Sequence, residues 1–169
     1  RGDSHDPEFG GEPTIASIPP SGGDVTELAL GFGREVGLAG AIGFDFSPDG
    51  SNLVFMGVPP VLNGRPGPED VGIWTASMDG SAHSALTGGR HFDSYSSWSP
   101  DGRWIAFLRL SEEDDYDSGH VFLVPADGGE ARQLTSARDP VEPGQVAFSP
   151  DGKLLATNGP ENEVGLWVV

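Results

Sequence analysis

A short segment of mixed charge, Arg90-His91-Phe92-Asp93-Ser94-Tyr95, holds the densest group of side chains that could bind a ligand. Arginine and tyrosine are enriched where proteins contact their partners. A second segment, Ser136–Gln145, adds two more charged side chains of interest. These residue types favour recognition by shape and charge, without covalent chemistry. We therefore expect candidate ligand or partner contacts at Arg90, His91, Asp93, Tyr95, Arg138 and Glu142.

The patterns of the common hydrolytic and metal-dependent enzymes are absent from the sequence. It contains no Gly-x-Ser-x-Gly, the motif that presents a hydrolase nucleophile on a sharp turn, and no His-Glu-x-x-His. The 4 histidines are scattered, and the absence of cysteine excludes disulfides, thiolate metal sites and cysteine nucleophiles. We expect no catalytic residue, no metal and no cofactor in this chain.

The chain is strongly acidic, with a formal net charge of −17 and a single lysine, Lys153. Such a surface repels phosphate backbones, so we do not expect nucleic acid as a partner. Net charge also favours solubility, and a salt-adapted source would give the same composition. No apolar stretch approaches the roughly 20 residues that span a bilayer. The acidic run Glu112–Asp117 is expected to be a solvated loop, with calcium binding as the alternative.

The candidate residues belong to a repeating framework. Ser-Pro-Asp-Gly occurs three times, each time after an aromatic residue and before an apolar run, at spacings of 52 and 50 residues. Asp-Gly between apolar runs favours a tight hairpin, because both residues tolerate positive φ. Each unit is therefore predicted to be a four-stranded antiparallel meander. The four tryptophans of the chain are expected in the cores of these units. The copies begin at Phe46, Trp98 and Phe148.

These units divide the chain into a half-unit at 13–30 and further units at about 31–86, 87–134 and 135–169. Counting two, four, four and three strands predicts thirteen strands in all. Residues 1–12 fit no unit and resemble a vector-encoded linker, so we expect them to be disordered.

At the level of the whole repeat, the sequence resembles a known family. The repeat is similar to the β-propeller repeat of TolB and of prolyl-oligopeptidase-type serine peptidases. The resemblance rests on an aromatic residue followed by Ser-Pro-Asp-Gly, and on Ala126-Asp127-Gly128-Gly129 before Leu134-Thr135. The resemblance covers about 14–169. It implies an all-β propeller of four-stranded blades, about three to three and a half in this chain, and a periplasmic or extracellular location. The motif carries little information about function.

Propeller geometry places the tight Asp-Gly turns on one face, which we call the turn face, and the longer loops on the opposite face, the loop face. Function concentrates on loops held by a rigid scaffold, so we expect the binding site on the loop face. For Asp93, ligand contact and tying of adjacent blades both stay open. A metal site in the central channel would need acidic residues from several blades. Asp45 is acidic, but the residues at the same position of the next two units are Ser97 and Ala147, so we do not expect such a site.

Ring closure is the main physical problem, because propellers use about four to eight blades. Two solutions are open: a partial propeller, or a homodimer in which two chains form a roughly six-bladed ring by completing each other's blade. The expected function is a non-catalytic binding or scaffold module for a protein, peptide or small ligand. The alternative is the gating propeller of a prolyl-oligopeptidase-like serine peptidase.

Overall fold

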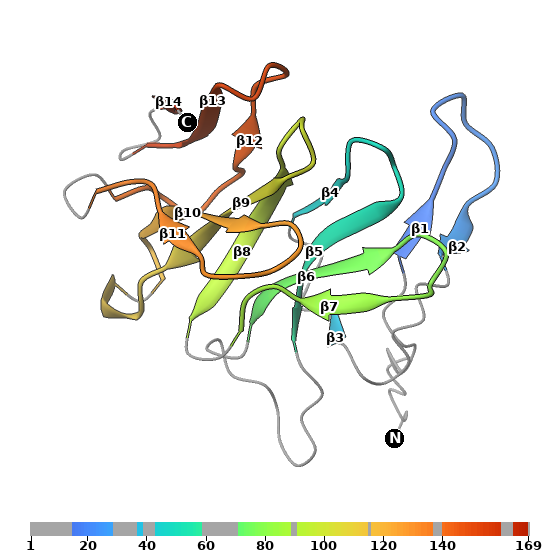
Figure 1. Cartoon of the computed structure of the whole chain (residues 1–169), viewed down its shortest axis with the longest axis horizontal. Coiled ribbons are helices and arrows are strands. Elements are labelled where there is room, and N and C mark those ends of the chain that lie inside the picture. Colours follow the sequence, from blue (N-terminus) through green and yellow to red (C-terminus); the bar gives the residue numbers. More distant parts are fainter. Residues whose placement is uncertain are drawn as a thin grey trace, which may run out of the picture.

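The computed structural model describes residues 15–28, 37–38, 43–58, 71–88, 91–114, 116–136, 140–159 and 164–168. Residues 1–12, expected to be a linker, lie outside this part of the chain. The described strands form antiparallel sheets, each built from strands that follow one another in sequence (Figure 1). No helix in the described part is long and apolar enough to cross a membrane.

The described strands form four sheets, which follow one another along the chain. A two-stranded sheet pairs β1 (Ile15–Ser17) with β2 (Thr26–Leu28). The first blade contains β3 (Gly37–Leu38), β4 (Phe44–Phe46), β5 (Asn52–Val58), β6 (Gly72–Ser77) and β7 (His83–Ala85). The middle blade contains β8 (Phe92–Trp98), β9 (Trp104–Leu110), β10 (Gly119–Pro125) and β11 (Arg132–Gln133). The last blade contains β12 (Ala147–Phe148), β13 (Leu154–Asn158) and β14 (Val164–Val168).

Within the described residues, the expected thirteen strands become fourteen because the first strand of the first blade is in two pieces. Both β3 and β4 pair with β5, β3 through Gly57 and Val58 and β4 through 53–55. The acidic run is also more regular than a simple loop, since Glu112–Asp114 form a single 3-10 turn, η2. No described strand crosses an expected unit boundary, while the limits of the domain stay a prediction.

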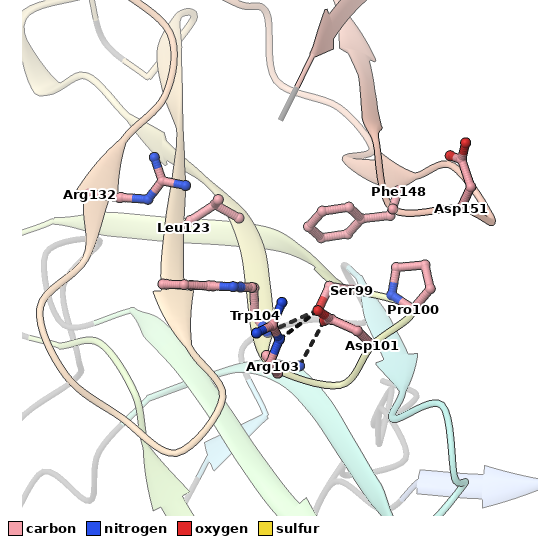
Figure 2. Close-up of a pocket in the computed structure, with 10 residues that line it drawn as sticks. Ser99, Pro100, Asp101, Arg103, Trp104, Leu123, Arg132, Phe148 and Asp151 are labelled. Atoms are coloured by element: carbon pink, nitrogen blue, oxygen red, sulfur yellow. Dashed lines mark hydrogen bonds and ion pairs between the residues drawn. The ribbon is translucent and has the colours of Figure 1, made fainter.

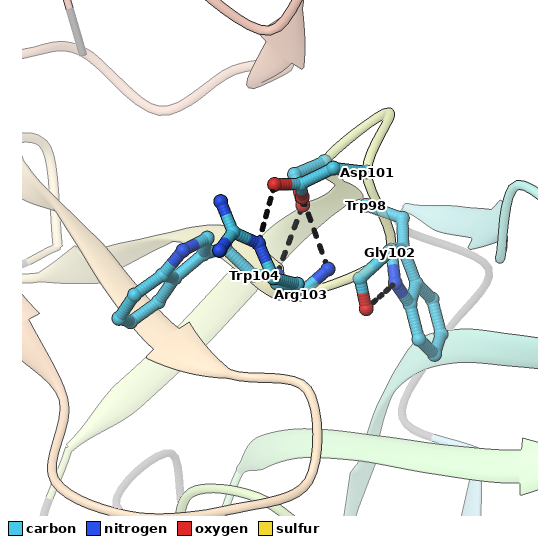
Figure 3. Close-up of polar contacts among 6 residues, drawn as sticks. Trp98, Asp101, Gly102, Arg103 and Trp104 are labelled. Carbon is cyan, nitrogen blue, oxygen red and sulfur yellow. Dashed lines mark hydrogen bonds and ion pairs between the residues drawn. The ribbon is translucent and has the colours of Figure 1, made fainter.

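The Ser-Pro-Asp-Gly sequence forms the same hydrogen-bonded hairpin turn in every copy, and Figure 3 shows part of the middle one. Ser99 Oγ donates to Asp101 at 2.7 Å and accepts from the Trp104 amide at 2.9 Å. Asp101 also accepts from the amide of Arg103 at 3.1 Å. The turn thus satisfies backbone donors at the start of the second strand, which explains why serine and aspartate recur together.

Only the glycine of each turn adopts positive φ, which is 74° at Gly102. The turn aspartates do not use this region, because the described non-glycine residues with positive φ are Tyr95 and Tyr116. Aspartate is present for its acceptor oxygens. The turn is a type I turn whose last residue is left-handed, and glycine accepts that conformation without steric cost.

Alternate side chains of β9 pack into two different clusters, one on each side of the middle blade. Ile105 and Phe107 join Val54 and Ile73 of the first blade. Leu108 joins Leu155 of the last blade and Val121 of β10. This period of two is the strand pattern of a sheet that is buried on both faces. The fold is therefore held together by the contacts between successive sheets.

A polar contact also connects the first and middle blades. Asp45, on β4, accepts hydrogen bonds from the Trp98 amide at 2.8 Å and from Ser97 Oγ at 3.1 Å. Ser97 occupies the position in the middle blade that corresponds to Asp45. The carboxylate considered as a channel metal ligand thus binds the neighbouring strand, and no group of three or more ligating side chains suited to a metal occurs among the described residues.

We predict that D45A destabilises the protein by about 2 kcal/mol, because it removes a charged acceptor from the Trp98 amide. D45N should lose less, since its amide oxygen can still accept. Urea unfolding measures both variants, with E130A as the control because Glu130 is exposed. A loss in D45A equal to that in E130A would contradict this role.

The turns also predict a dependence on acid. The hydrogen bond from Ser99, followed by that from the Arg103 amide, lowers the pKa of Asp101 from its ordinary 3.8 to about 2. A depressed pKa stabilises the fold above the ordinary value, and this contribution disappears as the pH falls through about 2. D101N, measured by urea midpoints between about pH 5 and about pH 2, should therefore lose less stability than the parent. D24N, at an exposed site, should follow the parent. If the urea midpoints of D101N and the parent fell equally with decreasing pH, this contribution of Asp101 would be excluded.

Candidate binding site at the loop face

A cavity of about 350 Å³ opens at the loop-face end of the middle blade. Its walls come from the segment before β8, the ends of β9 and β10, and the loop between them. The side chains that line it include His91, Arg109, Glu112, Glu113, His120 and Phe122. Of these, His91 is the one that the sequence predicts as a contact.

The centre of this region is a row of polar side chains across three strands. Asp93 on β8 lies opposite Arg109 on β9, and Arg109 lies opposite His120 on β10. Directly opposed residues of antiparallel strands share one face of the sheet. The strand register therefore brings together three polar residues that lie far apart in the sequence.

Asp93 and Arg109 form a two-pronged ion pair inside the blade. Arg109 Nε and Nη2 donate to the two carboxylate oxygens at 2.7 and 2.9 Å. The Asp93 side chain is 1% exposed and that of Arg109 is 21% exposed. Paired carboxylate and guanidinium planes give a geometrically specific contact. The carboxylate of Asp93 thus binds within its own blade, whereas the side chain of Asp45 contacts the neighbouring blade.

The guanidinium of Arg109 also stacks on aromatic rings, with its central carbon 4.5 Å from the ring centre of Phe122 and 5.6 Å from that of Phe107. The rings, themselves stacked at 5.7 Å, form a flat apolar support for the cation. Because its charge is compensated by Asp93, Arg109 serves to shape the cavity wall. The open charges of the cavity are the exposed carboxylates of Glu112 and Glu113.

His120 is half-buried and fixed at one ring nitrogen. Its Nδ1 lies 3.2 Å from Thr135 Oγ1, and this hydroxyl oxygen accepts a hydrogen bond from the Val121 amide at 3.1 Å. Thr135 is buried and sits just after β11. The outer part of the blade therefore orients this imidazole, while His91, which also lines the cavity, is exposed.

The remaining predicted contacts are dispersed. Arg90 and Arg138 lie outside the described residues. Glu142 is half-buried and follows Val141, which pairs with Gly119 at the start of β10 through two hydrogen bonds of 2.9 Å. Neither Glu142 nor Asp93 is among the residues that line the cavity.

Tyr95 lies at an irregularity in β8, where the pairing with β9 shifts between Ser94 and Ser97. Its φ is 51°, an uncommon value for a non-glycine residue, and its half-buried side chain packs against the cluster shared with the last blade. Gly43 approaches it so closely that an added Cβ would lie 3.0 Å from Tyr95 Cα. The structure therefore gives Tyr95 a packing position.

No family model matches this chain. A curated relative, the uncharacterized peptidase YuxL of Bacillus subtilis strain 168, is 39% identical over 110 residues. The match includes 65% of this chain and 16% of the relative. The chain thus spans a small part of that protein's length.

Solved structures give the architecture. TolB from Acinetobacter baumannii matches 92% of this chain and 35% of its own, with a TM-score of 0.64 and 13% identity. A putative TolB from Agrobacterium tumefaciens matches 96% of this chain and 55% of its own, with a TM-score of 0.63 and 20% identity. A putative dipeptidyl aminopeptidase IV from Bacteroides ovatus matches 75% of this chain and 22% of its own, with a TM-score of 0.55 and 17% identity. The chain is an all-β protein with the blades of a β-propeller.

We predict that D93A and R109A are strongly coupled, with an interaction free energy of about 2 kcal/mol in a double-mutant cycle. The pair is largely shielded from water, so added salt should weaken the coupling little. Urea unfolding of the parent, both single variants and the double variant measures it.

The exposed pair Arg103–Asp101, with a 2.7 Å contact and side chains 76% and 46% exposed, is the matched control. Its coupling should be much smaller and sensitive to salt. Additive effects of D93A and R109A would contradict a structural role for the buried pair.

Proposed function

We propose that this chain is a non-catalytic propeller module that binds a protein or peptide at its loop face. The observation that carries this proposal is the cavity lined by His91, His120, Glu112, Glu113 and Phe122, on a rigid base formed by the Asp93–Arg109 pair. Function concentrates on loops that a rigid scaffold positions.

The chemistry of the cavity suits the recognition of a basic or aromatic group. The two glutamates are exposed and sit on the short η2 turn, where they attract cations, and Phe122 supplies an apolar surface beside them. Two imidazoles add hydrogen-bonding groups of either polarity. This arrangement supports binding by charge and shape.

A second candidate is favoured by the curated relative, which is described as a peptidase. On this proposal the chain belongs to the gating propeller of a serine peptidase, and the loop face would meet peptides on their way to a hydrolase domain. The encoding gene tests it: a Gly-x-Ser-x-Gly motif in the same reading frame would support a peptidase, and a complete frame without one would exclude this class.

Two further expectations stay predictions. One is a homodimer formed by blade completion, and the other is a periplasmic or extracellular location. In the described part of the chain, β14 pairs with β13, whereas β1 and β2 form a separate two-stranded sheet.

The binding proposal predicts that a random decapeptide library displayed on phage yields ligands for the immobilised chain. Calorimetry on synthetic copies should give an affinity about tenfold weaker for E112Q/E113Q, because the charges that attract the peptide are lost. D127N/E130Q removes the same charge from exposed residues near the turn face and should bind like the parent. Mass spectrometry after incubation should show intact peptides.

Three results would contradict the proposal: no saturable ligand, ligands that are insensitive to E112Q/E113Q, or cleaved peptides. Because circular dichroism can verify that each variant is folded, a loss of binding can be assigned to the site.

A further inference from the structure

A second cavity, of about 450 Å³, lies on the turn face between the middle and last blades. Figure 2 shows Arg132 and Leu123 on one side and Phe148 and Asp151 on the other. Trp104 and Arg103 belong to the same wall. The volume falls within the range of about 300 to 1,000 Å³ that is usual for ligand pockets. The sequence predicts function on the opposite face and tryptophan in the core, yet Trp104 is half-buried here.

The carboxylates of this cavity are already occupied by the turns. Asp101 accepts from Ser99 and from Arg103 Nε, at 2.7 Å each. Asp151 accepts from Ser149 Oγ at 2.7 Å, and Lys153 lies 3.6 Å from it. The negative charges are therefore compensated by neighbouring cations within the turns.

Arg132, in contrast, is a cation whose charge the turns do not compensate. Its guanidinium carbon lies 5.6 Å from the ring centre of Trp104, and no ion pair joins it to a carboxylate among the described residues. Four cationic side chains lie in the described part of this strongly acidic chain, and two of them, Arg103 and Arg132, line this cavity. Arg132 is exposed, and an exposed arginine held over an aromatic ring is a ready partner for a planar anion.

The repeat provides an internal comparison, because a smaller cavity of about 240 Å³ lies at the corresponding place between the first and middle blades. In the first blade, Ser51 and Asn52 stand where the middle blade has Arg103 and Trp104. The cross-strand pair Thr75–Ser84 corresponds to Leu123–Arg132. Both turns have the same hydrogen bonds, with Ser47 donating to Asp49 at 2.6 Å.

It follows that the turn and the sheet do not require the aromatic and cationic residues of the larger cavity. The two sites also share their packing, since the glycine of each turn faces the proline of the preceding one. An added Cβ on Gly102 would lie 3.9 Å from Pro48, and one on Gly152 would lie 3.6 Å from Pro100. The difference between the cavities lies in side chains that could recognise a ligand.

We propose that the turn-face cavity binds the C-terminal residue of a peptide that ends in a bulky apolar amino acid. The free carboxylate would be held by Arg132, and the apolar side chain would pack among Trp104, Leu123 and Phe148. A carboxylate matches the planar donor fork of arginine, while the aromatic and aliphatic walls favour an apolar side chain beside it. A second binding site, separate from the loop face, follows from these contacts.

The test uses the whole chain labelled with nitrogen-15 and the peptide Gly-Gly-Ser-Gly-Phe with a free C-terminus. The indole N–H signal of Trp104, assigned with W104F, should shift and saturate. The same peptide with an amidated C-terminus should bind about tenfold more weakly or more, because it lacks the charge that Arg132 pairs with. Trp98 lines the smaller cavity and serves as the internal control, so its signal should stay in place.

R132S is the matching variant, since serine occupies the corresponding position in the first blade. R132S should keep the far-ultraviolet circular dichroism spectrum of the parent. Its affinity for the peptide with a free C-terminus should be lower by about tenfold or more, and R132K should have an intermediate affinity. D24N changes an exposed charge outside the lining and should bind like the parent. An unchanged Trp104 signal, equal binding of the amidated peptide, or equal shifts of Trp98 would each overturn the proposal.

Discussion

The fold depends on the burial of both faces of the middle blade. Alternate residues of β9 pack against the first blade and the last blade, and Ile105, Phe107 and Leu108 are fully buried. Each such side chain stabilises the fold by about 1.5 to 3 kcal/mol when it is removed from water. A single blade could not bury these side chains alone, so the sheets are stable as neighbours.

This constraint leaves the polar chemistry at the two ends of the blades. Where polar groups do enter the interior, they are matched in detail: Asp45 accepts from the next blade, and Asp93 receives both prongs of Arg109. Buried charges are expensive unless paired and hydrogen-bonded, so these contacts also limit how the sheets can be arranged. Within the described part of the chain, Ser94 and Ser96 keep buried hydroxyls without a hydrogen-bond partner beside the irregular Tyr95.

The two ends of the blades differ in charge. At the loop face, Arg109 is compensated by Asp93, and the uncompensated groups are the glutamates of η2. At the turn face, the aspartates are engaged by their own turns and Arg132 remains. The same scaffold therefore presents an acidic cavity at one end and a cationic, aromatic cavity at the other. Propeller blades allow this division because their framework fixes the strands and leaves the ends variable.

The sequence by itself determined the repeat, the antiparallel meander and the positions of the tight turns. These features are local: hydrogen bonds among Ser, Asp and Gly within a few residues specify each turn, and alternating apolar residues specify each strand. The site was less predictable. Of the contacts chosen from sequence, His91 alone lines the loop-face cavity in the described part of the chain.

Tertiary structure decided which side chains meet. The row Asp93–Arg109–His120 arises from strand register, and a shift of one residue would move every side chain to the other face. The link from Asp45 to Trp98 and the cavity around Arg132 depend on how neighbouring blades pack. Turn chemistry acts over a few residues and is legible in the sequence, whereas packing brings together residues about fifty positions apart and only the folded chain defines those contacts.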